Sequence, residues 1–359
     1  MTRITMVMAG DEEGGLEKHV VELSNGLAAR GYSVSVIAHA NYQSRLSHDV
    51  SFYALDLSRS RRNPLVLWQL YQAIKQSQPQ LLHVQANKAV AMVAPLLNWL
   101  KVPAVATLHN RKKQLKAFGR FDRIIAVSQQ VATQFEQTAI NAQNKVRVVL
   151  NGVAIQHALK PDLNPKQKTS LKSKQNIQAI AIGRLVSAKG FDLLIEAWQG
   201  ISANLWIVGD GPDIKVLRSQ IQQAGLADRI ELLGHRHDIA DLLTQADVFI
   251  ISSRNEGGPY TLAEALLLQT PVLATQVGMV PDVLPVALTC EPNNSVALHQ
   301  LLQTYVPQLN LLHTLSEPVY QFAQDHLSFE AMLTHTIAVY EELLQPAMTA
   351  LAETPQLKA

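Results

Sequence analysis

Short apolar runs alternate with longer amphipathic stretches over most of the chain. In the first half, the apolar runs predict buried strands at residues 4–8, 34–38, 81–84, 104–108, 124–127 and 146–150. Apolar residues at helical spacing predict helices between them at residues 15–30, 64–76, 88–99 and 129–137. Because strands and helices alternate, we expect an α/β fold with parallel sheet and helices on both faces.

A polar segment at residues 160–176, with two prolines and five lysines, interrupts the alternation and predicts a linker. Beyond it, strands are predicted at residues 177–182, 204–208, 230–233, 248–251 and 271–274. Helices are predicted between or after these strands at residues 191–199, 213–224, 238–245, 260–268 and 295–306, and the tail at 316–345 predicts two more.

The architecture is therefore duplicated, and the sequence predicts two doubly wound, Rossmann-like domains at residues 1–165 and 166–327. In such open sheets, ligands bind outside the carboxyl ends of the strands. We expect the two domains to face each other across a central cleft, because small-molecule sites favour domain interfaces.

Composition supports this picture and excludes several classes. The chain has 359 residues, of which 47% are hydrophobic and 17% charged, enough apolar residues for two cores. The single cysteine, Cys290, excludes an internal disulfide and a Cys-based zinc cluster. The apolar run at residues 4–10 is short and acidic residues follow it, so we expect no secretory signal. No long apolar stretch predicts a membrane span, and we expect a cytoplasmic protein.

Several common motifs are absent. The dinucleotide fingerprint G-x-G-x-x-G has its nearest match at residues 209–214, which lacks the third glycine, so a dehydrogenase is disfavoured. No P-loop, H-E-x-x-H or G-x-S-x-G motif occurs. His235 and His237 have no evident third ligand, which favours a polar loop over a metal site.

Three loops at predicted strand ends carry candidate chemistry. Gly14 and Gly15 let backbone amides approach an anion at a helix N-terminus, although a Gly-Gly turn is also common for steric reasons. Arg184 and Lys189 flank a turn after the first strand of the second domain. They would clamp a diphosphate, Arg184 by paired hydrogen bonds and Lys189 as a point charge; the alternative is a solvated loop.

The third loop follows the strand predicted at 248–251. Pro259 suits the first turn of a helix, which would free the amides of Gly257, Gly258, Tyr260 and Thr261 for an anion. Glu256 precedes this helix, and Glu264 lies in its second turn among apolar neighbours. A lone carboxylate in so apolar a helix needs a partner, which favours a functional role over a surface one.

In this order, the motifs resemble those of the retaining glycosyltransferases of family 4, which have the GT-B fold. The matching pieces cover nearly the whole chain and are Gly14-Gly15, Gly183-Arg184, Lys189-Gly190, Gly209-Asp210-Gly211-Pro212, Leu233-Gly234-His235, and Glu256 with Glu264. In one place the chain departs from the family pattern, because Gly258 and Pro259 stand where the family often has Phe and Gly.

The resemblance implies a role for each matched residue. Arg184 and Lys189 would bind the diphosphate of a nucleotide-sugar donor, Glu264 the ribose hydroxyls and Glu256 the hydroxyls of the transferred sugar. Gly15 would approach the donor from the first domain, and His109 would lie near the reacting centre. The catalytic set is then His109, Glu256, Arg184 and Lys189; the donor-binding set is Gly14, Gly15, Arg184, Lys189, Gly209, His235, Gly257, Gly258, Tyr260, Thr261 and Glu264.

The resemblance also implies retention of anomeric configuration, with the two cations stabilising the departing diphosphate where other transferases use a metal. We therefore expect no metal and no cofactor beyond the nucleotide-sugar co-substrate. A tail helix at residues 328–345, including Tyr340, is expected to cross back onto the first domain. His39 and His83 are expected to be structural or to lie on the acceptor side.

The net charge of +2 hides an asymmetry: residues 1–160 carry a net +10 and residues 161–359 a net −8. The cations cluster in two groups of the predicted acceptor domain, Arg59, Arg61, Arg62 and Arg111, Lys112, Lys113, Lys116, Arg120, Arg123. Three interpretations stay open: a solvated face, contact with the anionic inner face of the cytoplasmic membrane, or capture of a phosphorylated acceptor. The last two fit a lipid-linked acceptor such as lipopolysaccharide core.

Three rival functions are also considered. An epimerase of the same fold would act on a nucleotide sugar without an acceptor, and a binding protein would have no activity. Nucleic-acid binding is disfavoured, since Phe118 and Phe121 are the only aromatic residues among the second group of cations.

Overall fold

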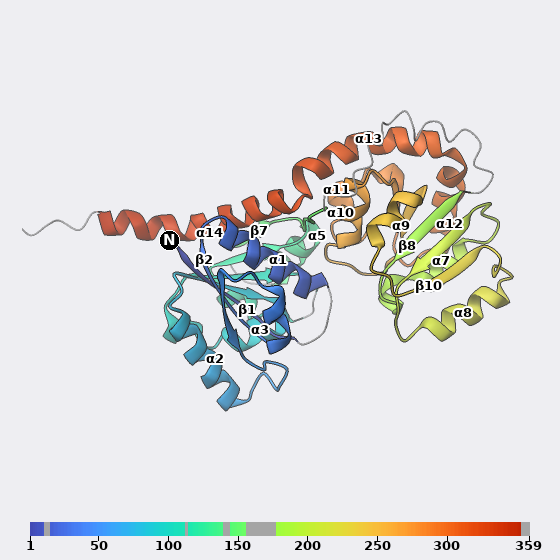
Figure 1. Ribbon diagram of the computed structural model, residues 1–359. Coiled ribbons are helices and arrows are strands. Elements are labelled where there is room, and N and C mark those ends of the chain that lie inside the picture. Colours follow the sequence, from blue (N-terminus) through green and yellow to red (C-terminus); the bar gives the residue numbers. More distant parts are fainter. Residues whose placement is uncertain (11–14, 112–113, 139–143, 156–176, 353–359) are drawn as a thin grey trace, which may run out of the picture. The chain divides into compact units, whose positions relative to one another are not determined.

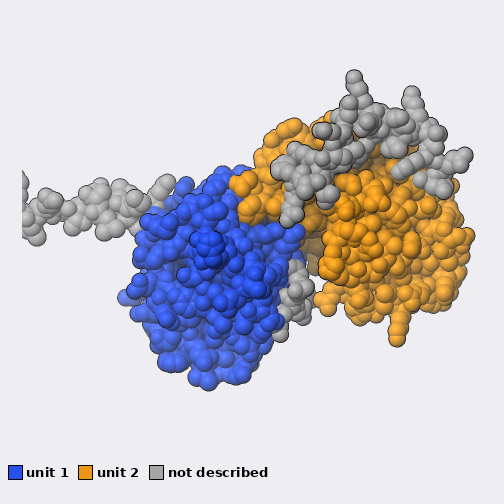
Figure 2. Space-filling view, viewed as in Figure 1, with its two compact units in different colours: residues 1–149, 332–359 blue, residues 150–331 orange. Residues whose placement is uncertain are grey.

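The computed structural model describes residues 1–10, 15–111, 114–138, 144–155 and 177–352. The chain forms two compact units, drawn in Figure 2: unit 1 comprises residues 1–149 and 332–359, and unit 2 comprises residues 150–331. The boundary predicted between residues 165 and 166 and the linker predicted at 160–176 lie outside the described residues.

Unit 1 is built on a seven-stranded sheet in which every strand pairs in parallel with its neighbours. The spatial order is β3-β2-β1-β4-β5-β6-β7, so the order reverses between β1 and β4. The strands are β1 (Arg3–Met8), β2 (Ser33–Ala38), β3 (Val50–Ala54), β4 (Leu81–Gln85), β5 (Ala104–Leu108), β6 (Arg123–Ala126) and β7 (Val146–Val148). The strand β3 was not predicted from the sequence, because this edge strand mixes polar and apolar residues and is only partly buried.

Among the described residues, six α-helices belong wholly or mainly to unit 1: α1 (Gly15–Ala29), α2 (Pro64–Ser77), α3 (Ala86–Val93), α4 (Leu97–Leu100), α5 (Gln129–Thr138) and most of α14 (Phe329–Ala352). The single helix predicted at 88–99 was wrong. It is interrupted around Pro95, since proline has no backbone N–H to continue the helical hydrogen bonds. Short 3-10 turns follow β2 (Ala40–Arg45) and precede β6 (Phe118–Arg120).

The two faces of this sheet are covered by different helices. Leu82 and Val84 of β4 belong to the core that includes residues of α2, α3 and α5. His83 lies between them and therefore points to the opposite face, where it contacts Tyr340 of α14. Figure 1 shows α2 and α3 on one side of this sheet and α14 on the other.

Unit 2 repeats the plan with a six-stranded, fully parallel sheet of order β10-β9-β8-β11-β12-β13. The order here reverses between β8 and β11. The strands are β8 (Gln178–Ile182), β9 (Asn204–Val208), β10 (Ile230–Gly234), β11 (Val248–Ile251), β12 (Val272–Thr275) and β13 (Thr289–Cys290). The two-residue β13 was missed because it is too short to make a periodic signal.

Helices cover both faces of this second sheet: α7 (Phe191–Ala197), α8 (Ile214–Gln223), α9 (Ile239–Gln245), α10 (Tyr260–Leu267), α11 (Val280–Val283), α12 (Ser295–Tyr305) and α13 (Leu309–His326). Alternate strand residues divide between two cores: Ala179 and Ala181 pack with α7, α8 and α12, whereas Ile180 packs with α9 and α10. The predicted pair of doubly wound α/β domains is therefore confirmed.

Two helices begin directly after an asparagine whose side chain caps the first turn. The Asn63 side chain accepts hydrogen bonds from the amides of Leu65 (3.0 Å) and Val66 (3.4 Å), and Pro64 occupies the first turn of α2. Asn294 caps α12 in the same way, through the amide of Ala297 at 2.9 Å. None of the helices among the described residues is long and apolar enough to cross a membrane.

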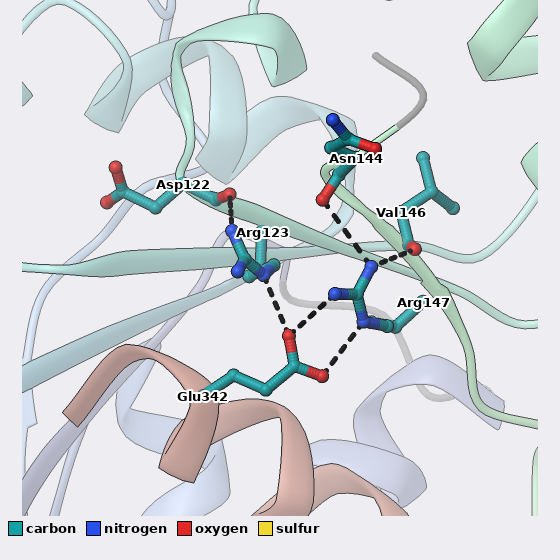
Figure 3. A network of polar contacts seen from close by, with 6 residues as sticks. All are labelled: Asp122, Arg123, Asn144, Val146, Arg147 and Glu342. Atoms are coloured by element: carbon teal, nitrogen blue, oxygen red, sulfur yellow. Dashed lines mark hydrogen bonds and ion pairs between the residues drawn. The ribbon is translucent and has the colours of Figure 1, made fainter. Parts of the chain in front are cut away.

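The carboxylate of Glu342 fastens α14 to the last two strands of unit 1, as Figure 3 shows. Arg147 of β7 reaches both carboxylate oxygens, Nε to Oε1 at 2.8 Å and Nη2 to Oε2 at 2.8 Å, and Arg123 of β6 donates from Nε to Oε2 at 3.0 Å. These hydrogen bonds, those of Arg147 above all, hold the pKa of Glu342 below its usual value. One carboxylate thus ties the tail helix to two strands.

We predict that Glu342→Gln lowers the free energy of unfolding of unit 1 by about 1 kcal/mol at pH 7, because these ion pairs are partly exposed to solvent. Since the pKa of Glu342 is depressed in the folded state, its contribution is present above the usual value of 4.5 and is lost as the pH falls through the lowered value. Denaturant unfolding at pH 7 and pH 4 measures both effects, with Glu341→Gln on the exposed side of the same helix as control. Equal losses in the two variants would contradict the assignment.

Candidate functional site

The point where strand order reverses in unit 2 holds an ion pair between two predicted site residues. Lys189 lies in a 3-10 turn (Ser187–Lys189) after β8, and Glu256 lies in the loop after β11. The Nζ of Lys189 donates to Oε1 of Glu256, which also accepts a hydrogen bond from Ser253 Oγ at 2.9 Å. Only 26% of the Lys189 side chain and 12% of the Glu256 side chain are exposed, so the pair lies largely out of solvent.

This ion pair lines a small pocket within unit 2. Its other lining residues come from the same strand ends and from the starts of α7 and α10: Ile182, Phe191, Ile250, Ile251, Ser252, Ser253, Pro259 and Thr261. In doubly wound sheets, the reversal point between strands is where ligands bind. The pocket therefore presents a cation, a carboxylate and hydroxyl-bearing side chains at the place expected for a ligand.

Glycines let the neighbouring loops of this site approach closely. A Cβ at Gly209, after β9, would overlap the carbonyl oxygen of Gly183, and one at Gly211 would overlap that of Leu185. Backbone hydrogen bonds join the same loops, from Gly183 N to Val208 O at 2.9 Å and from Gly209 N to Gly234 O at 2.8 Å. Gly209 therefore has a packing reason of its own, beside the donor contact predicted for it.

Arg254 connects the Glu256 loop to the Lys189 loop, a role that was not predicted from the sequence. Its guanidinium forms paired hydrogen bonds with Asp192 at 2.7 and 2.6 Å, and donates to Ser187 O at 2.7 Å and to Asn293 Oδ1 at 2.8 Å. Nothing local in the sequence pairs Arg254 with Asp192, which lies 62 residues away. The contact fixes the backbone that presents both members of the ion pair.

The start of α10 carries the remaining predicted donor residues. Gly257 is buried, whereas Gly258, Tyr260, Thr261 and Glu264 are half-buried. Buried Asn151, from outside this motif, donates from Nδ2 to the carbonyl oxygen of Gly258 at 2.7 Å. An Asn-Gly pair just after an apolar run was the only sequence signal for Asn151, and it equally indicates a simple turn.

Two other predicted residues lie at strand ends of unit 2 with exposed side chains. Arg184 follows Gly183 directly after β8, and His235 follows β10. The ring of His235 contacts that of His237 edge to face, with centroids 4.8 Å apart. Among the described residues, no three His, Cys, Asp or Glu side chains gather as metal ligands.

In unit 1, His109 follows β5 and joins a chain of polar side chains. Its Nε2 lies 2.8 Å from Oε1 of Gln85, the last residue of β4. Gln85 Nε2 lies 3.1 Å from His83 Nε2, and His83 Nδ1 lies 2.6 Å from the Tyr340 hydroxyl of α14. Gln85, His83 and Tyr340 are fully buried.

Burial makes the histidines of this cluster weak bases. It lowers the pKa of His83 to about 3 and that of His19, on α1, to about 4. Burial also holds the pKa of His109 well below its usual value, and the proximity of His19 and His83 adds to the effect. The rings of His19 and His109 lie edge to face, with their centroids 5.2 Å apart. His19 was not predicted from the sequence to lie beside His109.

The cations of the predicted basic surface fall into two kinds, those with exposed side chains and those in ion pairs. The side chains of Arg61, Arg62, Arg111, Lys116 and Arg120 are exposed. Arg59 lies 3.5 Å from Asp56, and Arg123 binds Glu342 with 25% of its side chain exposed. Gly15 begins α1 with an exposed backbone, whereas Gly14, Lys112 and Lys113 lie outside the described residues.

Comparison with known families identifies the class of this two-domain α/β protein. The profile of the family Glycosyltransferase Family 4 matches residues 13–157, and that of Glycosyl transferases group 1 matches residues 164–318. The chain belongs to the family 4 glycosyltransferases, with the GT-B fold.

Curated relatives come from distant organisms. An uncharacterized glycosyltransferase of Methanocaldococcus jannaschii is 28% identical, over 70% of this chain and 71% of that protein. The GPI3 subunit of phosphatidylinositol N-acetylglucosaminyltransferase from Saccharomyces cerevisiae is 25% identical, over 84% and 73% of the two chains. The lipopolysaccharide core biosynthesis glycosyltransferase LpsE of Rhizobium meliloti is 24% identical, over 74% and 76%.

A solved structure shares the whole fold. Anabaena HepE, crystallised in complex with UDP-glucose, superposes with a TM-score of 0.78 at 20% identity, over 96% of this chain and 100% of that one. The GT-B fold predicted from the sequence is thereby confirmed.

We predict that Gly209→Ala disrupts the loops around the ion pair, because its Cβ would strike the backbone of Gly183 and its φ of +137° disfavours other residues. The free energy of unfolding of unit 2 should fall by about 3 kcal/mol or more. Gly225→Ala is the matched control, with φ of +66° but open space around the Cβ, and should cost only about 1 kcal/mol. Urea unfolding compares the two, and equal losses would mean that the close contact is unimportant.

Proposed function

We propose that this glycosyltransferase moves a hexosyl or heptosyl group from a nucleotide-diphosphate sugar to an acceptor hydroxyl, with retention of configuration and without a metal. The observation that carries the proposal is the ion pair of Lys189 and Glu256 at the strand reversal point of unit 2. The UDP and UDP-glucose complexes of Anabaena HepE support a nucleotide-sugar donor.

A donor that enters this site would separate Lys189 from Glu256 and bind to both side chains. Lys189 would exchange the Glu256 carboxylate for oxygens of the diphosphate, and Glu256 would then accept hydrogen bonds from hydroxyls of the sugar. Arg184 would add a second cation, the Gly257–Thr261 backbone would contact phosphate or sugar, and Glu264 would hold the ribose. Without a donor, the pair neutralises itself, so no uncompensated charge is left in the pocket.

In the proposed reaction, the bond between the anomeric carbon and the diphosphate oxygen breaks, and a bond from that carbon to the acceptor oxygen forms on the same face. Lys189 and Arg184 stabilise the negative charge of the departing diphosphate. One of its oxygens accepts the proton of the acceptor hydroxyl. The family resemblance implies that His109 would act near the reacting centre, and closure around the donor would exclude water.

The acceptor is proposed to be a lipid-linked or phosphorylated glycan precursor, such as lipopolysaccharide core. Support comes from the names of two relatives, of which LpsE is a lipopolysaccharide core biosynthesis glycosyltransferase and the yeast protein a subunit of phosphatidylinositol N-acetylglucosaminyltransferase. The rivals, an epimerase of the same fold or a nucleotide-sugar-binding protein, are separated by analysing products with and without acceptor. Epimerisation needs no acceptor, and a binding protein yields no product.

We predict that Lys189→Ala and Arg184→Ala each lower turnover about 100-fold or more while the fold persists, because each removes a cation from the leaving group. The matched controls are Lys215→Ala and Arg218→Ala, exposed cations on α8 of the same unit, which should change turnover less than about two-fold. Steady-state transfer to an added acceptor measures all four. Near-normal turnover in both site variants would refute the assignment.

The membrane interpretation of the basic surface gains support from apolar neighbours. Leu65 and Trp68, in the first turns of α2, are 56% and 59% exposed and follow Arg61 and Arg62 in the chain. Exposed Trp beside cations suits the interface of an anionic bilayer.

We predict that the protein co-sediments with anionic vesicles more than with neutral ones, and that the double variant Arg61→Ala, Arg62→Ala weakens binding about 30-fold, at ~1 kcal/mol for each cation. The double variant Lys215→Ala, Arg218→Ala, in the acidic half of the chain, is the control. Equal binding to both vesicle types, or to neither, would favour direct capture of an acceptor phosphate or a solvated face instead.

A further inference from the structure

We propose that Gln85, His83 and Tyr340 are positioning residues that fix the ring orientation and the tautomer of His109. The proposal goes beyond the proposed function, and it rests on that function only in assigning His109 to the reaction. It assigns the tail helix a part in the chemistry of unit 1, besides packing on its sheet.

The polarity of the contact between His109 and Gln85 follows from the kind of atom at each end. A side-chain amide oxygen can only accept, so Gln85 Oε1 at 2.8 Å requires that His109 Nε2 carries the proton. His109 is neutral at neutral pH, because burial holds its pKa well below the usual value. The lone pair of the ring is therefore on Nδ1, the nitrogen that Gln85 leaves free to accept a proton or a hydrogen bond.

The orientation of the Gln85 amide is set in turn by His83. The amide nitrogen of Gln85 can only donate, and it faces the His83 ring, 3.1 Å from Nε2 and 3.5 Å from Nδ1. The Thr107 hydroxyl lies 2.7 Å from Nε2 and forms the hydrogen bond to that nitrogen. Burial keeps the His83 ring neutral, so it carries no positive charge that would repel the amide hydrogens of Gln85.

This series of hydrogen bonds ends at the phenol of Tyr340 on α14. His83 Nδ1 and the Tyr340 oxygen form a hydrogen bond of 2.6 Å, which holds the His83 ring in place together with the contact to Thr107. All three supporting side chains are fully buried, so water does not compete for these hydrogen bonds. The sequence separation of 257 residues between His83 and Tyr340 means that His109 has its geometry only when α14 is docked on unit 1.

Two variants test the chain of hydrogen bonds. Gln85→Met keeps the length of the side chain and removes both hydrogen bonds, whereas Tyr340→Phe removes only the terminal hydroxyl. Tyr320→Phe, a buried tyrosine of α13 in unit 2, is the matched control. The readouts are the ring 15N shifts of His109, identified by its missing signals in His109→Asn, and the kcat and KM of transfer.

We expect wild-type His109 to give a single neutral tautomer protonated at Nε2. In Gln85→Met, we expect mixed tautomers and a fall in kcat of about ten-fold or more, with donor KM nearly unchanged. Tyr340→Phe should lower kcat about three-fold, and Tyr320→Phe should leave it unchanged.

A His109 that keeps the single Nε2 tautomer in Gln85→Met would overturn the proposal, as would equal losses in the two Tyr→Phe variants. Mixed tautomers with undiminished turnover would support the positioning and reject only the role of His109 in the reaction. Loss of turnover in Lys189→Ala is independent of these outcomes, so failure of the proposed function can be recognised separately.

Discussion

Parallel pairing of every strand is the constraint on which both sites depend. In each sheet, all carboxyl ends lie along one edge, so the loops that follow the strands meet there whatever their separation in sequence. This brings Lys189 and Glu256 together across 67 residues in unit 2, and His109 and Gln85 across 24 in unit 1. The chemistry of this glycosyltransferase is therefore gathered by topology.

The two units use this edge in physically different ways. The edge in unit 2 holds charged groups, paired with each other and braced by the Arg254–Asp192 contact. That arrangement suits an anionic ligand that can replace one charge by another. The edge in unit 1 holds neutral groups, because burial removes the charge from its histidines and leaves directional hydrogen bonds as the organising force. Ion pairs thus organise the strand-end loops in unit 2, and hydrogen bonds between neutral side chains organise them in unit 1.

The sequence predicted the elements that repeat a strong pattern and the groups that follow them directly. Lys189 and Glu256 were found because each closes a loop after a buried strand. Arg254, Asn151 and Gln85 were not singled out, since their partners are distant in sequence and no local pattern identifies a supporting hydrogen bond. The edge strand β3 was missed for a related reason: its half-exposed residues give no continuous apolar run. The supporting contacts depend on the tertiary structure, whereas the candidate residues at strand ends can be recognised from the local sequence.

The central claim is that Lys189 leaves Glu256 to bind the diphosphate of a donor, and thermal unfolding with a panel of nucleotide sugars tests it most directly. A uridine, guanosine or adenosine diphosphate sugar should raise the melting temperature, the nucleotide diphosphate alone should raise it partly, and Lys189→Ala should lose most of both shifts. A saturating donor at about 100 times its Kd corresponds to about 2.7 kcal/mol. If no nucleotide sugar stabilises the protein, or if Lys189→Ala is stabilised as much as the wild type, the account of this site is wrong.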